Sequence, residues 1–298
     1  MKFTNKHNLP EVFVAAIMED SYTKGDANIS VTGLLAPPQQ RRLLEKHDDE
    51  IVTDVSDHMA ILHGKALHYI AEKAANDQHH ILAEKILYSH YLGWKIKGQF
   101  DQVLIGEGKL LDIKTCSAYK VSDGVVPEEW VQQTNIYKRM LQKEKGLVIN
   151  NIQIAVSVKD FSKKIARTKS NYPPAAGFTM DVPVWEDDVI DALIEERVRL
   201  HQLEEPPSCS DKDIWARSPK WAVMKRGNIK AVRLFDNPFE AEQFASTSAA
   251  FHIEHRPGEA VRCQEWCGAA PFCPQWTADP RNIQPTPSIT ETLFDAKV

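Results

Sequence analysis

The chain lacks several features that would assign it directly to a class. No apolar run approaches the roughly 20 residues of a membrane-spanning helix, and residues 1–12 (MKFTNKHNLPEV) have no apolar signal-peptide core. We therefore expect a cytoplasmic protein with no membrane partner. An excess of positive charge is also missing, because 36 Lys and Arg stand against 41 Asp and Glu. This balance excludes a globally basic surface, but an acidic chain can still carry a local basic groove.

Cysteine is scarce and unevenly placed. Residues 1–115 contain none, whereas Cys263, Cys267 and Cys273 form a C-x₃-C-x₅-C pattern near the end of the chain. In a chain of 298 residues without a secretory signal, such clustering is typical of metal or iron–sulfur ligation more than of disulfides. With 43% hydrophobic and 26% charged residues, the composition is otherwise that of a globular protein with one large domain or two smaller ones.

The most informative stretch is residues 94–115 (WKIKGQFDQVLIGEGKLLDIKT), in which two β-forming runs flank a Gly-Glu-Gly turn signal. A two-residue turn at 106–107 would pair Val103 with Leu110 and Asp101 with Asp112, and would turn Lys114 to the same face. Two carboxylates this close repel unless a cation or a shared proton holds them, and such ligands suit Mg²⁺ or Mn²⁺. The alternative is two ordinary charges on the solvated face of a hairpin. Against it, the apolar neighbours of Asp112 predict a strand buried on both faces, where an aspartate needs a partner.

Helices are predicted on both sides of this hairpin. Residues 56–76 have a helical period, with Gly64 in the interior and His68 one turn later on the same face. A second helix over residues 79–92 would carry Glu84 on an apolar stripe. After the hairpin, an amphipathic helix over residues 128–143 places Gln133 and Tyr137 four residues apart, where they could contact a phosphate or a base. These residues also have ordinary structural explanations. His68 would be a packed histidine, Glu84 a carboxylate at the edge of the apolar stripe, and Tyr137 a core tyrosine.

A strongly basic segment follows a predicted strand at residues 150–158. Binding of a nucleic-acid backbone and a solvated loop are both compatible with it. It contains Lys159, Lys163, Lys164, Arg167 and Lys169.

The remaining elements are short. Helices are predicted at residues 12–18 and 39–47, a brief strand at 29–32, and a charged helix that ends near residue 203. Beyond residue 206, the order of patterns predicts a small appended ββαβ module, which leads into the cysteine cluster.

Taken in order, these residues resemble the PD-(D/E)XK nuclease superfamily, in particular its RecB-type branch, which includes CRISPR-adaptation and phage recombination nucleases. The motifs are G-x-x-x-H at 64–68, the helical Glu84, G-x-x-D at 98–101, D-I-K at 112–114 and Q-x-x-x-Y at 133–137. Each motif alone is weak, whereas all five in this order are specific. The resemblance covers about a quarter of the chain and implies an α/β, restriction-endonuclease-like core, with a central mixed sheet flanked by helices.

The resemblance also implies a role for each of these side chains in metal-assisted hydrolysis of phosphodiester bonds, in which a cation activates water and neutralises charge on the phosphate. Lys114 would face the attacking water, and Glu84 would assist the metal site. Gln133 and Tyr137 would line the path of the DNA. The ligands of Mg²⁺ or Mn²⁺ would be His68, Asp101, Asp112 and the carbonyl of Ile113.

Some members of this branch close the nuclease domain with a [4Fe–4S] cluster, and the clustered cysteines resemble its ligands, with Zn²⁺ as the alternative metal. Such members usually take a fourth cysteine from the N-terminal region, where this chain has none. Cys209 is the best candidate for the fourth ligand. Cys116 is a poorer candidate because it adjoins the strand that carries Asp112, and His255 is a further alternative. The alternative to any ligation is a set of reduced core thiols beside Trp266 and Trp276.

These observations predict four parts: an N-terminal segment (1–55), a nuclease core (56–205), the ββαβ module with the cysteine cluster (206–278), and a Pro- and Thr-rich tail (279–298) expected to be disordered.

The leading hypothesis is a metal-dependent DNA exonuclease of recombination, repair or replication in a bacterium or a phage-infected host cell, with DNA and a recombination or single-strand-binding protein as partners. A catalytically idle DNA-binding or assembly subunit and a structure-specific endonuclease are the alternatives. The intact acids and lysine argue against the idle subunit, because a binding module has no use for a repelling pair of aspartates.

Overall fold

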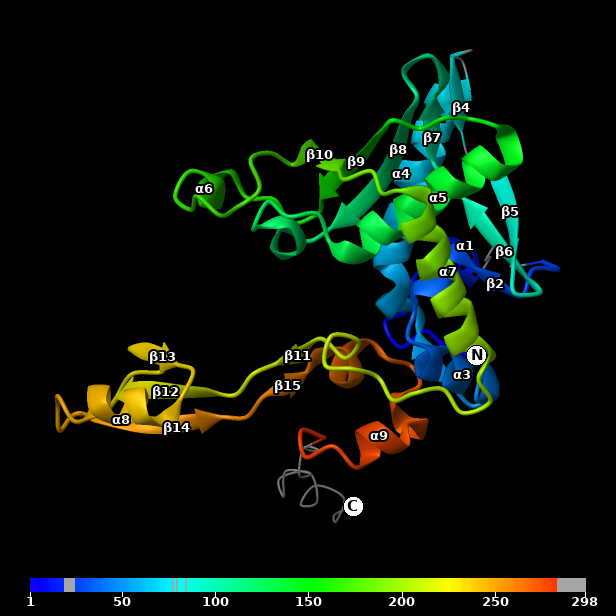
Figure 1. Ribbon diagram of the computed structural model, residues 1–298. Helices are drawn as coiled ribbons and strands as arrows, with labels where there is room; N and C mark the ends of the chain where they lie inside the picture. Colours follow the sequence, from blue (N-terminus) through cyan, green and yellow to red (C-terminus); the bar gives the residue numbers. More distant parts are fainter. Residues whose placement is uncertain (19–24, 77, 79, 84, 283–298) are drawn as a thin grey trace. The chain divides into compact units, whose positions relative to one another are not determined.

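The computed structural model describes residues 1–18, 25–76, 78, 80–83 and 85–282 (Figure 1). The described chain is a mixture of α-helices and β-strands and divides into two compact units. The first unit comprises Met1–Arg41 and Val52–Pro206, and the second comprises Arg42–Ile51 and the chain from Pro207 on. The boundary after Pro206 coincides with the change of sequence pattern at that position.

The first unit contains most of the regular elements. In chain order they are β1 (Lys2–Thr4), α1 (Glu11–Met18), β2 (Ile29–Ser30), α2 (Val31–Leu35), β3 (Val52–Asp54), α4 (Met59–Asn76), β4 (Ile81–Ala83), β5 (Ile86–Tyr91), β6 (Trp94–Gln99), β7 (Gln102–Leu104), β8 (Lys109–Cys116), α5 (Glu128–Lys145), β9 (Asn151–Val158), α6 (Lys163–Ala166), β10 (Gly177–Val182) and α7 (Asp187–Gln202). The helix α3 (Pro38–Lys46) crosses the boundary between the units.

The main sheet of this unit has the strand order β10-β9-β8-β7-β4 among the described residues. Strands β8 and β9 are parallel and in register along their whole length, whereas the other pairs are antiparallel. A smaller sheet has the order β2-β6-β5, and β1 pairs with β3. Strand β8 has a neighbouring strand on each side and helices over it. None of its residues is exposed, and its sequence shows little alternation between apolar and polar residues, as expected of a strand inside a mixed sheet.

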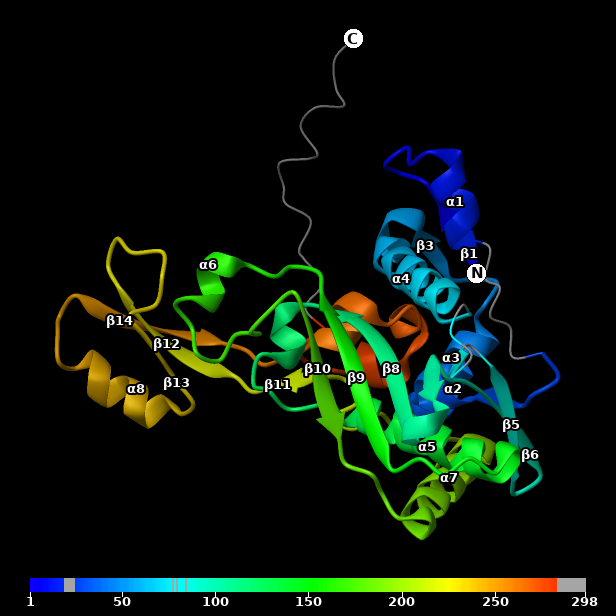
Figure 2. The same cartoon turned by 90° about the horizontal axis from the view of Figure 1, so that it is seen from above.

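Helices α4 and α5 cover opposite faces of β8 (Figure 2). On the α4 face, a Cβ at Gly64 would lie 3.5 Å from the Thr115 hydroxyl, so the helix passes close to a side chain of the strand. On the other face, Lys114 is hydrogen-bonded to Gln133 of α5. Adjacent residues of β8 therefore contact different helices, because successive side chains of a strand point to opposite faces of the sheet.

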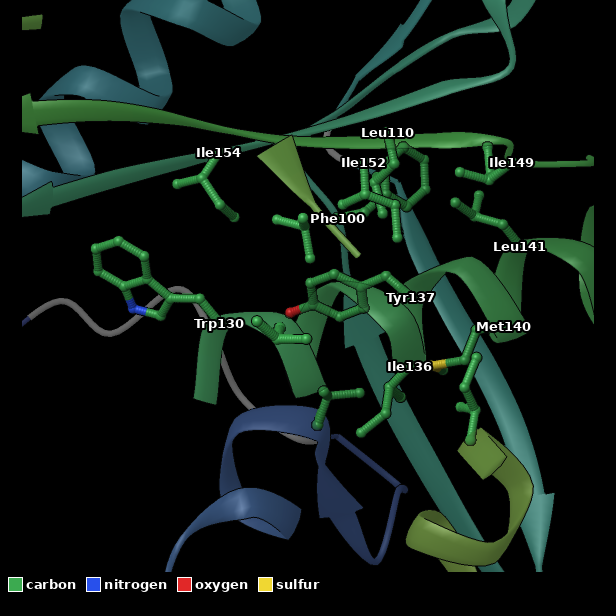
Figure 3. Close-up of a cluster of buried hydrophobic side chains, with 14 of the residues drawn as sticks. Phe100, Leu110, Trp130, Ile136, Tyr137, Met140, Leu141, Ile149, Ile152 and Ile154 are labelled. Atoms are coloured by element: carbon green, nitrogen blue, oxygen red, sulfur yellow. The ribbon is translucent and has the colours of Figure 1, made fainter. Parts of the chain in front are cut away.

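The core of the first unit lies between the main sheet and α5 (Figure 3). Tyr137 of α5 points toward the main sheet, and Gly98 of β6 allows the close approach of Tyr137 and Met140. A Cβ at Gly98 would lie 2.9 Å from the sulfur of Met140 and 3.1 Å from Cε1 of Tyr137. The glycine of the G-x-x-D motif is thus required by helix packing.

Most predicted helices and strands agree with the structure, including α4, α5, β9 and α7. The helix predicted over residues 79–92 is wrong, because β5 is a strand with Leu87, Ser89 and Tyr91 buried and Tyr88 exposed. Leu87, Tyr88 and Tyr91, which would share one face of a helix, are divided between the two faces of this strand. The strand predicted over residues 29–32 ends at Ser30, whose hydroxyl caps the short helix α2 by accepting a hydrogen bond from the N–H of Gly33.

The second unit contains two small groups of strands. Strands β12, β13 and β14 form a sheet in the order β13-β12-β14 with α8 against it, so that the elements follow in the order β, β, α, β. Strands β11 and β15 pair beside the cysteine cluster. The predicted disordered tail lies mainly at 283–298, outside the described residues. The elements are β11 (Ala216–Arg217), β12 (Lys220–Lys225), β13 (Arg233–Phe235), α8 (Pro238–Ala245), β14 (Phe251–Arg256), β15 (Glu259–Ala260) and α9 (Pro274–Thr277).

No helix in the described part of the chain is long and apolar enough to cross a membrane.

Candidate functional site

Asp101 lies where the chain passes from the smaller sheet to the main sheet. Strand β6 ends at Gln99, the fully buried Phe100 anchors the junction, and β7 begins at Gln102. The observed pairing of Val103 with Leu110 is the register expected from the sequence, although the turn is longer than two residues and ends at Gly108 in the left-handed region (φ 56°). Asp101 therefore reaches the side of β8, where its Oδ2 accepts a hydrogen bond from the N–H of Ile113 at 2.5 Å.

The carbonyl of Ile113 projects from the same edge of β8 as this N–H, because both groups of one strand residue point to the same side. The ladder between β7 and β8 ends at the pair of Gln102 and Leu111, so it does not extend to Ile113. The structure thus directs one backbone carbonyl and one carboxylate toward the place where β7 begins.

Asp112, the residue before Ile113 on β8, is 1% exposed. Burial is the largest influence on it and raises the pKa of its carboxyl to about 6, against the opposing effect of the Lys114 ammonium and with a further increase from Asp101. Lys114 Nζ lies 2.8 Å from Asp112 Oδ2, which is ion-pair distance. Nevertheless, this oxygen has no partner with acceptable hydrogen-bond geometry among the described residues. The ammonium thus balances the charge of Asp112 without forming a well-aligned hydrogen bond to Oδ2.

A buried carboxylate oxygen without a hydrogen bond is rare and costly. The Lys114 ammonium offsets part of this cost, and a ligand, a proton or a metal cation would complete the bonding of the oxygen.

Lys114 is held by helix α5 as well as by Asp112. Its ammonium donates a hydrogen bond of 2.8 Å to Oε1 of Gln133, whose amide nitrogen donates one of 2.9 Å to the hydroxyl of Tyr137. Tyr137 is 4% exposed and its ring belongs to the core, so the geometry does not support the expected direct contact of this ring with DNA. Instead, its hydroxyl orients Gln133, which in turn orients Lys114.

His68 approaches the site from α4. Its Nδ1 lies 3.2 Å from Asp101 Oδ1, and its side chain is one-third exposed. The structure therefore brings His68, Asp101, Asp112, Lys114 and Gln133 into one chain of contacts. Glu84, which was expected to assist the site, lies outside the described residues.

These side chains form a chain of pairwise contacts and do not surround a single point. Within the described ranges, no three His, Cys, Asp or Glu side chains converge in a way that could hold a metal ion. Lys114 now lies against the Asp112 oxygen that a cation would need.

A hollow of about 420 Å³ lies beside the site on the α4 face of the sheet. It is lined mainly by apolar side chains, among them Leu67 and Ala71 of α4 and Leu111 and Ile113 of β8. The sequence analysis missed it, although the small residues Ala71, Ala74 and Ala75 on one side of α4 were a visible signal.

In the second unit, four cysteines share one small apolar cluster. Cys273 is buried, and Cys209, Cys263 and Cys267 pack against the same group of residues. Burial raises the pKa of the Cys209 thiol to about 12, and the other three cysteines raise it further. Burial and its cysteine neighbours likewise raise the pKa of Cys263 to about 11.

The backbone of Cys209 is fixed from both sides by one side chain. Gln275 accepts a hydrogen bond from the N–H of Cys209 at 2.9 Å and donates one to its carbonyl at 2.7 Å. The two other residues considered as a fourth ligand lie elsewhere: Cys116 is buried in the core of the first unit, and His255 lies on β14 with its ring against Trp221.

No protein-family model and no curated protein matches this chain. Among solved structures, the chain is similar to a protein described as SSO0001, with a TM-score of 0.44 and 19% identity over 63% of this chain and 84% of the other. It is also similar to a phage-related exonuclease from Haemophilus somnus 129PT, with a TM-score of 0.28 and 15% identity over 47% of this chain and 67% of the other.

Proposed function

We propose that the protein is a metal-dependent deoxyribonuclease of the PD-(D/E)XK type, most simply an exonuclease, on a restriction-endonuclease-like core. The observation that carries this proposal is the buried Asp112, whose unsatisfied oxygen lies beside Lys114. The pair of Asp101 and His68 adjoins it through Ile113. A mixed sheet between α4 and α5 is the frame that such a core needs.

The donor groups suit a divalent cation of the Mg²⁺ or Mn²⁺ class. Two carboxylates, a backbone carbonyl and an imidazole are available at one strand edge, and one carboxylate oxygen lacks a hydrogen bond. The ligands would be His68, Asp101, Asp112 and the carbonyl of Ile113. Lys114 would have to yield the Asp112 oxygen when the cation binds, and its contact with Gln133 keeps it within reach of the site.

When bound, the cation would activate a water molecule and offset the negative charge that develops on the phosphate. The side chains of the protein have separate tasks. Asp101 is fixed by the N–H of Ile113, so its second oxygen keeps one direction. Lys114, oriented by Gln133, presents its ammonium to the attacking water or to a phosphate oxygen.

Nuclease activity of the full chain on linear double-stranded, linear single-stranded and closed circular DNA, with Mg²⁺ or Mn²⁺, tests this function. We expect linear DNA to be degraded by the parent and spared by Lys114→Ala. Cleavage of closed circles would make the protein an endonuclease. If neither protein cuts any substrate with either metal, the nuclease assignment is wrong and the idle DNA-binding subunit replaces it.

We further propose that Cys209, Cys263, Cys267 and Cys273 hold a [4Fe–4S] cluster or Zn²⁺. The four cysteines share one apolar cluster and are close enough to influence one another's pKa, although they do not converge on one point, so a bound metal would draw the sulfurs together as thiolates. Iron, sulfide and zinc content and the visible absorption spectrum after anaerobic purification test this proposal. We expect Cys209→Ser to lose the bound metal, and the absence of both metals from the parent would contradict the assignment.

A further inference from the structure

The connection between β9 and β10 forms a projecting arm on the first unit. It consists of residues 159–172, contains α6, and extends beyond the ends of β9 and β10 in both views (Figure 1, Figure 2). We call this segment the basic arm.

The basic arm carries five basic residues and one acidic residue. The acidic residue, Asp160, forms no ion pair with them, and its carboxylate accepts a hydrogen bond of 2.6 Å from the N–H of Ala118, so five positive charges and one negative charge leave the arm with a net charge of +4. Within the described residues, no carboxylate lies at ion-pair distance from any of the five cations, all of which are exposed: Lys159, Lys163, Lys164, Arg167 and Lys169.

Cations elsewhere in the same unit are treated differently. Lys138, Arg139 and Lys143 of α5 all form ion pairs with Asp187 or Asp191 of α7. Five unpaired cations on one segment repel one another, and a polyanionic partner would relieve that repulsion.

The arm is built on a defined scaffold. The hydroxyl of Tyr172 accepts a hydrogen bond from the N–H of Ser162 at 2.9 Å and donates one to the carbonyl of Asp160 at 3.1 Å. Its ring contacts that of Phe161, with centroids 5.8 Å apart, and the adjacent Pro173 is buried. These contacts tie the two ends of the arm together, so the cations are presented on an ordered support.

The base of the arm is joined to the end of β8, the strand that carries Asp112 and Lys114. Asp160 bonds Ala118, and the N–H of Lys159 donates to the carbonyl of Cys116 at 2.9 Å. The next residue after Ala118 is Tyr119, whose side chain is 79% exposed. Tyr119 follows Lys114 by five positions, which is at most about 17 Å of extended chain. An exposed aromatic ring therefore lies just beyond the end of the strand that carries the candidate site, beside the base of the arm.

We propose that the basic arm and Tyr119 bind single-stranded DNA and direct it to the site at Asp112. The cations would contact successive phosphates, and the ring of Tyr119 would stack on one base. This inference rests on the proposed nuclease function and specifies its substrate as a strand with an unpaired segment. A single strand is favoured over a duplex because a protruding ring can stack only on a base that is free of its neighbours.

Binding of fluorescein-labelled oligo(dT) and of a blunt duplex to the full chain, measured by fluorescence anisotropy in EDTA over a range of salt concentrations, tests this inference. The parent should bind the single strand more tightly than the duplex. Each lost phosphate contact lowers the slope of log K against log salt by about 0.7, so Lys163→Gln with Lys164→Gln should lower it by about 1.4. The matched control is Lys2→Gln with Lys6→Gln, two exposed lysines of the N-terminal segment that are not part of the arm.

Tyr119→Ala should weaken single-strand binding by roughly 5- to 100-fold, leave the salt slope unchanged and have little effect on the duplex, whereas Tyr119→Phe should bind like the parent. All these positions are exposed, so the fold should be unaffected, which circular dichroism checks. The inference is overturned if the arm variant keeps the affinity and slope of the Lys2 and Lys6 control, or if Tyr119→Ala weakens both DNAs equally. Because binding is measured in EDTA, it does not depend on cleavage. A parent that binds the single strand here but cuts no DNA with Mg²⁺ or Mn²⁺ would reject the nuclease and leave this surface in place.

Discussion

Helix α5 contributes to the environments of two aspartates that differ in bonding and in burial, since Asp112 is 1% exposed and the side chain of Asp191 is 27% exposed. Near its C-terminal half, Asp191 of α7 accepts hydrogen bonds from Tyr91, Arg139 and Lys143. Burial alone would raise the pKa of Asp191, but these donors hold that pKa well below its usual range. Near the N-terminal half, Asp112 has an oxygen without a hydrogen bond, and its pKa is raised to about 6.

A fully bonded network is worth more to stability than its separate pairs, whereas an incompletely bonded one costs stability. The bonding of Asp191 is that of a carboxylate that stabilises the fold. The incomplete bonding of Asp112 costs stability, and proteins retain such costs mainly where activity requires them, which supports the proposed role of Asp112 as a metal ligand.

The largest effect is expected on cleavage. Asp112→Asn should lower nuclease activity by at least about 10³-fold, because it removes a charged ligand at the reacting centre. Asp191→Asn, measured at a temperature where it is folded, should keep activity within a few-fold of the parent. Initial rates on linear DNA with Mn²⁺ check both, and equal losses in the two variants would break the comparison.

The two aspartates should also give opposite dependence of stability on pH. The folded pKa of Asp112, about 6, is above the ordinary value near 3.9, so the cost of its charge appears as pH rises from about 4 to 6 and is full above that, up to about 3 kcal/mol. Relative to the parent, Asp112→Asn should gain thermal stability over that pH range.

Because the folded pKa of Asp191 is lowered, its stabilisation is present above pH 4 and is lost as pH falls below that value. Melting temperatures of both variants and the parent between about pH 2 and pH 8 measure these differences. Parallel curves for Asp112→Asn and the parent would contradict the assignment.

Divalent cations should stabilise the protein through the site at Asp112, whose Oδ2 lacks a hydrogen bond, and not through Asp191. At about 100 times the dissociation constant, Mg²⁺ or Mn²⁺ adds about 2.7 kcal/mol to the free energy of unfolding. We expect a rise in melting temperature at pH 8 for the parent and for Asp191→Asn, but none for Asp112→Asn. An equal rise in all three proteins would mean that the metal binds elsewhere.

Asp191→Asn should lower the free energy of unfolding by about 2 kcal/mol at pH 7, since it weakens several hydrogen bonds to charged donors. Urea denaturation at constant pH measures the loss. A neutral result would show that this network contributes less than its geometry indicates.

The smallest effect is expected at the end of the chain of contacts. Tyr137→Phe removes the hydroxyl that accepts a hydrogen bond from Gln133, so Lys114 becomes less well oriented. We expect a two- to five-fold lower kcat with little change in KM and about 1 kcal/mol less stability. A change in KM alone would indicate that Tyr137 contacts the substrate.

The sequence predicted the register of the hairpin, because that signal was local. The pairing of Val103 with Leu110 follows from a glycine-rich turn between two β-forming runs, but the ladder ends at Gln102 and Leu111, so Asp101 bonds the N–H of Ile113 and does not pair with Asp112. Helical spacing likewise predicted that Gln133 and Tyr137 project together. It failed at residues 79–92, because Leu87 and Tyr91 fit a helical stripe as well as they fit an alternating strand.

By itself, the sequence determined which residues have chemistry to offer and how they are spaced within one strand or helix. Periods of 2 and 3.6 residues follow from backbone geometry, so they can be predicted without the fold. Only the tertiary structure decided that Asp101 bonds the N–H of Ile113, that Tyr137 is buried beneath Gly98, and that Cys209 joins the three later cysteines. These outcomes depend on which segments distant in sequence pack together, and burial then decides whether each polar group finds a partner.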